Sequence, residues 1–223
     1  MPIVLFFLLL IFFFPWLVLP LTAFFLLNLL LLPFGFTLRS LWNFFTVPGE
    51  LLRIALNPNL RKNHALEHAT INVLEERFGP QRLSGNAAEN GFYIHGAADP
   101  QLIEEAARIG HSRLLAGERR LAIHKRCGTT IAAANFVASA VFLALLLGSG
   151  HFTLLNVVAA LAVANLAGPV LGSLLQAYVT TNTDVRDRVI IGVEYGFGRP
   201  PAFVPWSWQA LPTEFFVRTK VIK

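Results

Sequence analysis

Charge is absent from two long stretches of the sequence. Residues 2–32 contain no Asp, Glu, Lys, Arg or His, and within residues 128–183 only His151 can carry a charge. Each stretch exceeds the roughly 20 apolar residues that cross a bilayer as one helix. Over all 223 residues, 14% of the side chains are charged and 55% are hydrophobic, whereas soluble domains average about 25% charged. This composition excludes an ordinary soluble protein and predicts an integral membrane protein.

The N-terminal stretch also lacks the features of a cleaved secretory signal. Such a signal has a basic segment, an apolar core of about 7 to 15 residues and a small-x-small cleavage site, and none of the three is present. A straight helix over residues 2–32 would be about 46 Å long, against a hydrocarbon core of about 30 Å. Because Pro15 and Pro20 can kink it, we predict one tilted or kinked span within residues 1–35. A re-entrant hairpin that turns between these prolines is the alternative.

The second apolar stretch divides at Gly148–His151, whose glycine and polar residues suit a tight connection between antiparallel helices. We therefore predict a transmembrane hairpin over residues 130–180, with spans near Thr130–Leu147 and Thr153–Tyr178. Alanines in both spans offer small surfaces for close helix contact. Neither span contains Asp, Glu, Lys or Arg, so no charged side chain marks an ion path.

Basic residues are absent from residues 148–152 and from the N-terminal stretch, whereas Arg39–Arg126 holds twelve and the tail from Arg186 onward holds six. By the positive-inside rule, the N-terminus lies outside, and the middle segment and the C-terminus are cytoplasmic. Three crossings of a bacterial cytoplasmic (inner) membrane satisfy this arrangement. The net charge of +5 suits contact with anionic lipid and requires no nucleic acid. The expected partners are the lipid bilayer and other membrane proteins.

Two segments next to the apolar stretches suit the membrane interface. Residues 36–57 mix aromatic, aliphatic and basic side chains, which is typical of an amphipathic interfacial segment, here broken in two at Pro48–Gly49. Residues 181–223 are expected to form a cytoplasmic or interfacial tail, with Trp206 and Trp208 packed at the membrane.

Most charged side chains fall between the apolar stretches, where residues 58–129 predict a small cytoplasmic α+β domain. The predicted fold is therefore a membrane α-helical protein with about three transmembrane helices and this domain inserted between the first and second spans. The expected elements of the domain are a helix over Asn59–Phe78, strands at Gln81–Ser84 and Gly91–His95, a helix over Pro100–Gly117 and a strand over Arg119–Lys125.

Metal-binding chemistry is indicated by His64-Ala65-Leu66-Glu67-His68. Histidines four residues apart lie on one face of a helix, one turn apart, and can bind a single metal ion. This H-x-x-E-H spacing resembles the inverted zincins. The resemblance covers five residues and implies that His64 and His68 are zinc ligands and that Glu67 is the general base. The third ligand of that family, a downstream Glu, has no clear match, because Glu75 lies about 10 Å further along the helix.

A second cluster, His124-Lys125-Arg126-Cys127, has the His-x-x-Cys spacing of two ligands to one ion. With the two histidines of the first cluster, His124 and Cys127 would complete a tetrahedral site that favours zinc over magnesium or calcium. A closed site of this kind is structural. If His124 or Cys127 stays out, water can take the fourth position and the glutamate can act on it. His95 is a reserve ligand.

The same residues also have an interpretation without metal. The two histidines of H-x-x-E-H would then be polar members of an amphipathic helix, and their glutamate would pair with a base such as Arg61 or Lys62. Cys127 has no disulfide partner in the chain, and a buried cysteine usually behaves as a small apolar side chain.

The wider pattern, with Asn63–Ile71 followed by Gly91–Tyr93 and Ile123–Thr129, resembles a family of uncharacterised bacterial membrane proteins over about residues 61–130. The resemblance implies that these motifs form one unit and adds no mechanism, because that family has no established activity. No nucleotide site is expected, since the glycines of Gly192–Gly198 lack the dinucleotide-binding spacing.

Two functions fit these features. The preferred one is a non-catalytic membrane scaffold or assembly factor whose cytoplasmic domain binds a structural metal ion, zinc by its ligands. The alternative is a membrane-anchored zinc-dependent hydrolase or peptidase with Glu67 as the catalytic base. The preference rests on the closed ligand set of His64, His68, His124 and Cys127 and on the lack of a recognisable substrate pocket.

Overall fold

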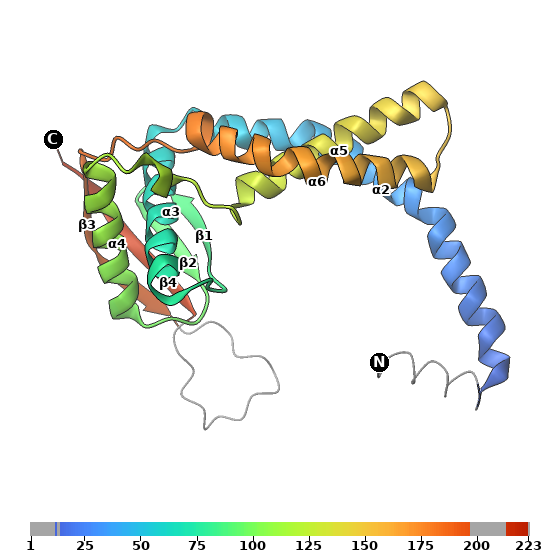
Figure 1. Ribbon diagram of the computed structural model, residues 1–223, viewed down its shortest axis with the longest axis horizontal. Coiled ribbons are helices and arrows are strands. Elements are labelled where there is room, and N and C mark those ends of the chain that lie inside the picture. The colour runs from blue at the N-terminus through green and yellow to red at the C-terminus, as the bar shows by residue number, and fades with distance from the viewer. Residues whose placement is uncertain (1–11, 13, 197–212, 223) are drawn as a thin grey trace.

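Three helices of the structure are long and apolar enough to cross a membrane, as the two charge-free stretches predict. They are α2 (Val18–Ala55), α5 (Gly128–Ser149) and α6 (Leu154–Leu175). The computed structural model describes residues 12, 14–196 and 213–222, and Figure 1 shows these helices as an arm that extends from a smaller domain. The fold is mostly helical, with a small sheet at one end of the arm.

Helix α2 is longer than predicted and unbroken. It follows a 3-10 turn, η1 (Pro15–Leu17), and continues for 38 residues through Pro33 and Pro48. The predicted break at Pro48–Gly49 is wrong, whereas the interfacial position of residues 36–57 stays a prediction. Packing outweighs the helix-breaking residues, because α2 lies along α5. The aromatic contacts between the two helices are Phe36–Phe142 and Phe44–Phe136, with ring centroids 4.9 and 5.5 Å apart.

Part of the predicted N-terminal span, residues 1–11 and 13, lies outside the described residues. The re-entrant hairpin therefore stays a prediction. Residues Val18–Ala55 form a single helix without a re-entrant turn.

Helices α5 and α6 form the predicted hairpin. Gly150, directly after α5, has a φ of +69°, the left-handed conformation that glycine commonly adopts at a helix C-terminus. Thr153 caps α6, because its hydroxyl accepts a hydrogen bond from the backbone N–H of Asn156 at 3.2 Å. Both features lie in the short polar connection that the sequence indicates.

The hairpin helices approach closely at two glycines of α6. A Cβ added to Gly168 would lie 2.6 Å from the Cβ of Ala134, and one added to Gly172 would lie 2.6 Å from the hydroxyl of Thr130. Small residues allow this approach, as in other membrane helix pairs. Beyond Leu175, the helix continues as a π-helical turn, η3 (Gln176–Thr180), which enters the domain.

The domain is a four-stranded antiparallel sheet with two helices on one face (Figure 1). The strand order is β1-β2-β4-β3, so β1 and β3 are the edges. Leu66 and Ile103 from the helices pack with Phe92 and Phe215 from the strands, and none of the four is more than 1% exposed. The elements are α3 (Pro58–Phe78), β1 (Ser84–Ala88), β2 (Gly91–His95), α4 (Pro100–Leu115), β3 (Arg188–Gly196) and β4 (Glu214–Val221).

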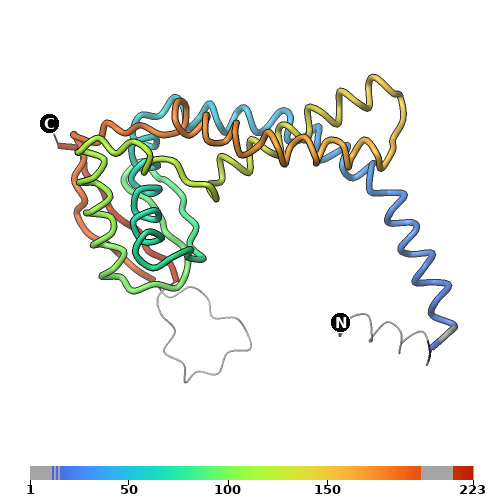
Figure 2. Tube along the Cα trace, in the orientation of Figure 1, coloured from blue at the N-terminus to red at the C-terminus, as the bar shows by residue number. Residues whose placement is uncertain are grey.

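The domain is not a simple insertion between the first and second spans. Strands β3 and β4 come from residues 181–223, which were expected to form a tail, and β4 pairs with β2 in the middle of the sheet. Figure 2 shows the C-terminal strands returning to the domain after the chain has passed through the hairpin. The burial of β4 alternates, with Phe215, Val217 and Thr219 facing inward. Trp206 and Trp208 lie outside the described residues.

Two other expected strands differ. The strand predicted at Gln81–Ser84 begins only at Ser84 as β1, and residues Arg119–Ala122 form a 3-10 turn, η2, instead of a strand. The turn forms because the Arg119 N–H bonds the carbonyl of Gly117 and the Leu121 N–H bonds that of Glu118. The helices predicted over Asn59–Phe78 and Pro100–Gly117 match α3 and α4 closely.

Candidate metal centre

Helix α3 carries the H-x-x-E-H residues in the interior of the protein. The helix begins at Pro58, and the side chain of Asn57 caps it by accepting from the N–H groups of Asn59 and Leu60. Asn63–Ile71 are nine consecutive buried residues, so this part of α3 has no solvated face. The interpretation of the histidines as polar members of an amphipathic surface helix therefore does not hold.

Backbone carbonyls orient both histidine rings. The Nδ1 of His64 is 3.0 Å from the carbonyl oxygen of Thr180, and the Nδ1 of His68 is 2.7 Å from that of Ala122. A carbonyl only accepts, so each Nδ1 carries the proton and each Nε2 keeps its lone pair. Burial is the main cause that lowers the pKa of both rings, which favours the neutral form that binds metal.

Cys127 lies directly before α5 and meets the histidines. Its Sγ lies 3.3 Å from the Nε2 of His64, and the two histidine rings are 4.3 Å apart between centroids. The ligand atoms of His64, His68 and Cys127 all lie within 4.8 Å of one another. Tetrahedral zinc sites separate such atoms by about 3.3 to 3.8 Å, given bonds of about 2.0 Å to nitrogen and 2.3 Å to sulfur. Small side-chain movements would therefore suffice to hold one ion.

The position of Cys127 also suits a thiolate. The residue is the N-cap of α5, and its Sγ accepts a hydrogen bond from the N–H of Thr129 at 3.3 Å. Burial raises the pKa of this thiol, so without metal the S–H donates to the Nε2 of His64. A metal ion favours the thiolate, and the positive end of the α5 dipole stabilises it further.

Glu67 stands beside this cluster with a carboxylate that lacks a full set of partners. Burial raises its pKa to about 8, and its buried Oε2 has no hydrogen-bond partner among the described residues. The same is true of the Nε2 of His68. Unpartnered buried polar atoms are uncommon and mark sites where an ion or water belongs. The Nε2 of His68 belongs to the cluster that could hold a metal, and Glu67 lines the pocket beside it.

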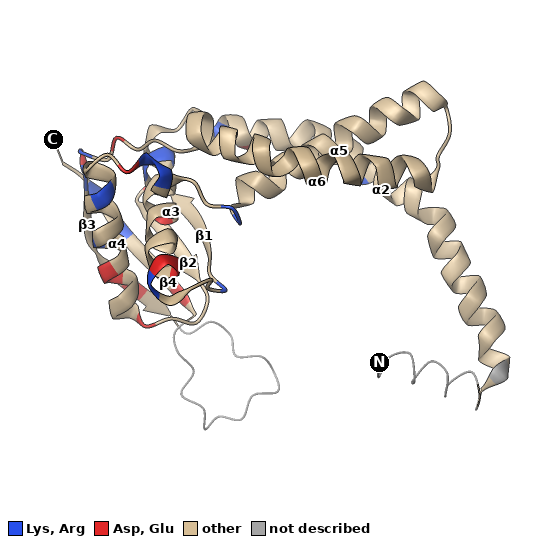
Figure 3. Cartoon of the chain, viewed as in Figure 1, with Lys and Arg blue, Asp and Glu red and all other residues tan. Residues whose placement is uncertain are grey.

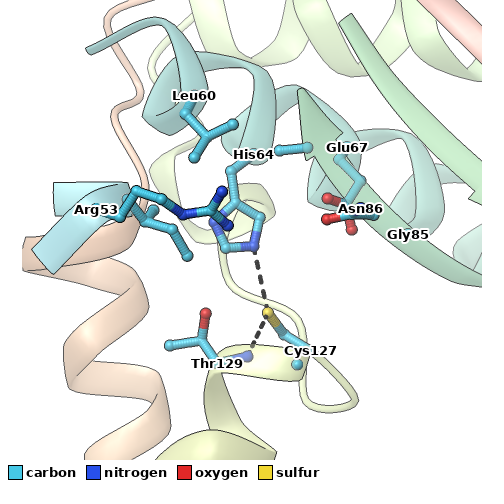
Figure 4. A pocket seen from close by; sticks show the side chains of 11 residues that line it. Arg53, Leu60, His64, Glu67, Gly85, Asn86, Cys127 and Thr129 are labelled. Atoms are coloured by element: carbon cyan, nitrogen blue, oxygen red, sulfur yellow. Dashed lines mark hydrogen bonds between the residues drawn. The ribbon is translucent and has the colours of Figure 1, made fainter. Parts of the chain in front are cut away.

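A pocket of about 140 Å³ opens onto the cluster. Figure 4 shows His64, Glu67 and Cys127 around it, with strand β1 behind the carboxylate. Gly85 of β1 makes room for Glu67, because a Cβ at this position would lie 2.5 Å from the Cγ of Glu67 and closer still to its carboxylate. Arg53, at the end of α2, lines the pocket as well.

His124, the fourth predicted ligand, lies outside the group. Its Nε2 is 3.4 Å from a carboxylate oxygen of Glu75, which also pairs with Arg126, and its ring centroid is 6.0 Å from that of His68. Its backbone N–H donates to the side chain of Gln176 at 2.7 Å. The 3-10 turn before it brings the Ala122 carbonyl to His68 and turns the His124 ring toward the far end of α3. The structure thus brings together three of the four predicted ligands.

The other histidines are also apart from the cluster. His95 is exposed at the end of β2, where its ring stacks on Tyr93 with centroids 6.0 Å apart. His151 lies in the connection between α5 and α6 at the far end of the arm.

Sequence reasoning missed the residues that support the ligands. Thr180 and Ala122 act through backbone carbonyls, which every residue has, so no sequence signal marks them. Gly85 did carry a signal, because glycine inside a strand often marks a close approach of another group.

The comparisons with known proteins agree with a single unit that contains this cluster. Residues 59–193, more than half of the chain, match the family described as a domain of unknown function, DUF6391. An uncharacterized protein of Picosynechococcus sp. (strain PCC 7002) is 33% identical over 180 residues, which cover 73% of this chain and 84% of the relative. No solved structure matches the chain. The matched range includes His64, His68, Glu67 and Cys127, and the chain belongs to the DUF6391 family.

Proposed function

We propose that this protein is a membrane-anchored, zinc-dependent hydrolase. The observation that carries the proposal is the open ligand set: three oriented ligand atoms from His64, His68 and Cys127, with the buried carboxylate of Glu67 beside them at a pocket. Catalytic zinc sites typically have three protein ligands and a water, whereas structural sites have four. With His124 turned away, the catalytic arrangement fits better than the scaffold that the sequence favours.

The metal, Glu67 and the backbone carbonyls have separate roles in this proposal. Zinc held here would supply Lewis-acid activation of a water molecule and of a substrate carbonyl. Glu67 accepts the proton of the attacking water and then donates it to the leaving group, and a nearby cation would lower its raised pKa toward the reactive range. The carbonyls of Thr180 and Ala122 hold the two imidazoles in the orientation that presents Nε2.

The edge of the sheet suggests an extended peptide as the substrate. The carbonyl of Asn90 accepts from the N–H of Thr219 on β4, and the N–H of Gly96 donates to the carbonyl of Thr213, directly before β4. The alternate residues of β2 between them, such as Tyr93, therefore bond to β1. Tyr93 pairs with Asn86, which leaves the N–H and C=O groups of Gly85 and Ala87 directed to the open edge.

Both of these outward-facing residues line the pocket. An extended chain can add to such an edge through main-chain hydrogen bonds. A peptide paired with β1 would pass beside Glu67, which lies against Gly85. We therefore propose a peptidase whose substrates are membrane-proximal segments of other proteins. The distribution of Arg and Lys supports a cytoplasmic site and an N-terminus outside.

The second candidate is the scaffold with a structural metal. It is favoured by one observation, which is that the cluster joins α3 of the domain to the first residue before α5 of the hairpin. A metal ion at this point would fasten the domain to the membrane arm. The two functions predict the same ion and differ in the role of Glu67.

Elemental mass spectrometry and a peptidase assay together test the proposal. The detergent-purified protein would be compared with His64→Ala, Cys127→Ala and Glu67→Gln, and with His151→Ala as the matched control. We expect about one zinc per chain in the wild type, Glu67→Gln and His151→Ala, and loss of zinc in the other two. Cleavage of a fluorogenic peptide library should occur only with the wild type and His151→Ala.

The possible results separate the two functions. If Glu67→Gln retains zinc and cleaves as well as the wild type, Glu67 is not the general base. Zinc without any cleavage by the wild type supports the structural role. Absence of zinc from the wild type, before and after its addition, refutes both.

A further inference from the structure

A second pocket, which shares no lining residue with the pocket at the metal centre, is lined by arginine. It has a volume of about 540 Å³ and lies between the start of α3, the turn η2 and the chain segment that follows α6. None of the described residues that line it carries a carboxylate. Its basic residues are Arg61, Arg119 and Arg120, and Thr181, Asn182 and Thr183 complete that side of the wall.

The carboxylates near this pocket are committed to other bases. Asp184 pairs with Arg186 at 2.8 Å, Glu118 with Arg113 at 2.7 Å and Asp187 with Lys62 at 2.8 Å. In the described part of the chain, no acidic side chain forms an ion pair with any of the three pocket arginines. The three basic residues, of which Arg119 and Arg120 are exposed, give this pocket a positively charged lining that favours an anion.

Arg61 shows the same lack of a counter-charge in more detail. Its Nη2 donates to the carbonyl oxygens of Tyr178 and Thr181, each at 3.2 Å, which fixes the side chain at the wall of the pocket. Its Nε is buried and has no partner among the residues that the structure describes. A buried N–H without an acceptor is unfavourable, and a shift of the side chain toward an anion in the pocket would relieve this. Guanidinium groups recognise phosphate with paired hydrogen bonds.

The place of the pocket identifies the source of the phosphate. Tyr178 on its wall is 76% exposed and lies directly after the apolar helix α6, where aromatic side chains of membrane proteins sit at the level of the lipid headgroups. Figure 3 shows Lys and Arg around the start of α3, next to this end of the arm, whereas α5 and α6 carry none. A lipid phosphate is the anion that is always present at this level.

We propose that the arginine pocket binds the phosphate group of an anionic phospholipid. The proposal is independent of the hydrolase, because its three arginines take no part in the metal centre and it needs no metal. The site does lie next to the metal centre, since the carbonyl that orients His64 belongs to Thr180, directly before Thr181 of the pocket wall.

Native mass spectrometry from mixed micelles of phosphatidylcholine and phosphatidylglycerol tests the site. The full-length protein would be compared with Arg119→Gln/Arg120→Gln and with Arg77→Gln/Arg108→Gln, a control that removes the same charge from exposed arginines paired with Glu105 and Glu104. We expect the wild type and the control to retain phosphatidylglycerol in preference to phosphatidylcholine. The pocket variant should lose about fivefold in this preference for each arginine removed.

A second arm distinguishes lipid from free phosphate. Inorganic phosphate at millimolar concentration should leave the bound phosphatidylglycerol in place. Displacement of the lipid by inorganic phosphate would show a solute site and overturn the lipid assignment. An equal loss of preference in the pocket variant and the control would show general charge attraction and overturn the site. Unchanged melting temperatures of both double variants would exclude misfolding, and Arg61→Gln provides a third variant in the pocket wall.

Discussion

Replacing Gly85 with alanine tests whether strand β1 holds the Glu67 carboxylate in its working position. The added methyl group would lie 2.5 Å from the Cγ of Glu67 and closer to its carboxylate, whereas ordinary contacts are at least about 3.4 Å. Glu67 is only 4% exposed and fills the space against Gly85, so its side chain must be displaced by about 1 Å. Overpacking of this kind costs about 1 to 3 kcal/mol of folding free energy.

Activity should fall much more than stability. A displacement of about 1 Å at a reacting group can lower the rate about 100-fold, and loss of a general base lowers it about 100- to 10,000-fold. The melting temperature should fall by at least about 2 °C. Zinc content should stay the same, because the nearest atoms to the added methyl group all belong to Glu67 and none to His64, His68 or Cys127.

The assay combines kcat/KM for a cleaved peptide, elemental zinc analysis and thermal melting in detergent. Gly192→Ala is the matched control, since it makes the same change on strand β3, where a Cβ would meet nothing within 4 Å. Wild-type activity in Gly85→Ala would refute the idea that Glu67 works from this position. Loss of zinc in Gly85→Ala would instead indicate that the Glu67 carboxylate is a metal ligand.

Three further predictions follow from the geometry. His124→Ala should keep its zinc, while His64→Ala should lose it, as measured by elemental analysis; equal loss would return His124 to the ligand set. Gly172→Val should lower the melting temperature in detergent by several degrees because the added Cβ meets α5, whereas Gly148→Val, with nothing within 4 Å, should change it little. In metal-free protein, the raised pKa of Glu67 means that its contribution to stability is present below the unfolded value of 4.5 and is lost as pH rises toward about 8. In thermal melts, the stability of Glu67→Gln relative to the wild type should therefore increase across this pH window. The increase should be a few kcal/mol, at about 1.36 kcal/mol per pKa unit. A difference that does not change with pH would contradict a buried Glu67 carboxylate.

The hairpin and helix α3 could be predicted from sequence because their signals are local. Apolar length and the glycine-rich connection define α5 and α6, and the i, i+4 spacing of His64 and His68 already places both rings on one face of a helix. Proline and glycine at Pro48–Gly49 misled the prediction for α2, because packing along α5 outweighs their local preference.

The sheet could not be predicted in the same way, because its pairing is not local. Strand β4 lies more than 100 residues after β2, with the whole hairpin between them. Its alternating pattern is short and adjoins residues outside the described part of the chain, so it suits a tail as well as a strand. The His-x-x-Cys spacing likewise allows the His124 ring to point toward the cluster or toward Glu75. The turn η2, which the sequence did not predict, determines that it points toward Glu75.

The discontinuous sheet has a consequence for synthesis of the protein. The ligands on α3 and Cys127 leave the ribosome well before β4, which completes the middle of the sheet only after both hairpin helices have been made. At about 5 to 20 residues per second, several seconds separate these events. During that interval the sheet consists of β1 and β2 alone, and α3 lacks the hydrogen bond that the Thr219 hydroxyl of β4 donates to Asn63. Thr180, whose carbonyl orients His64, has yet to be joined to α3. A hydrolase built in this way would remain inactive on the ribosome and mature only after its hairpin has entered the membrane.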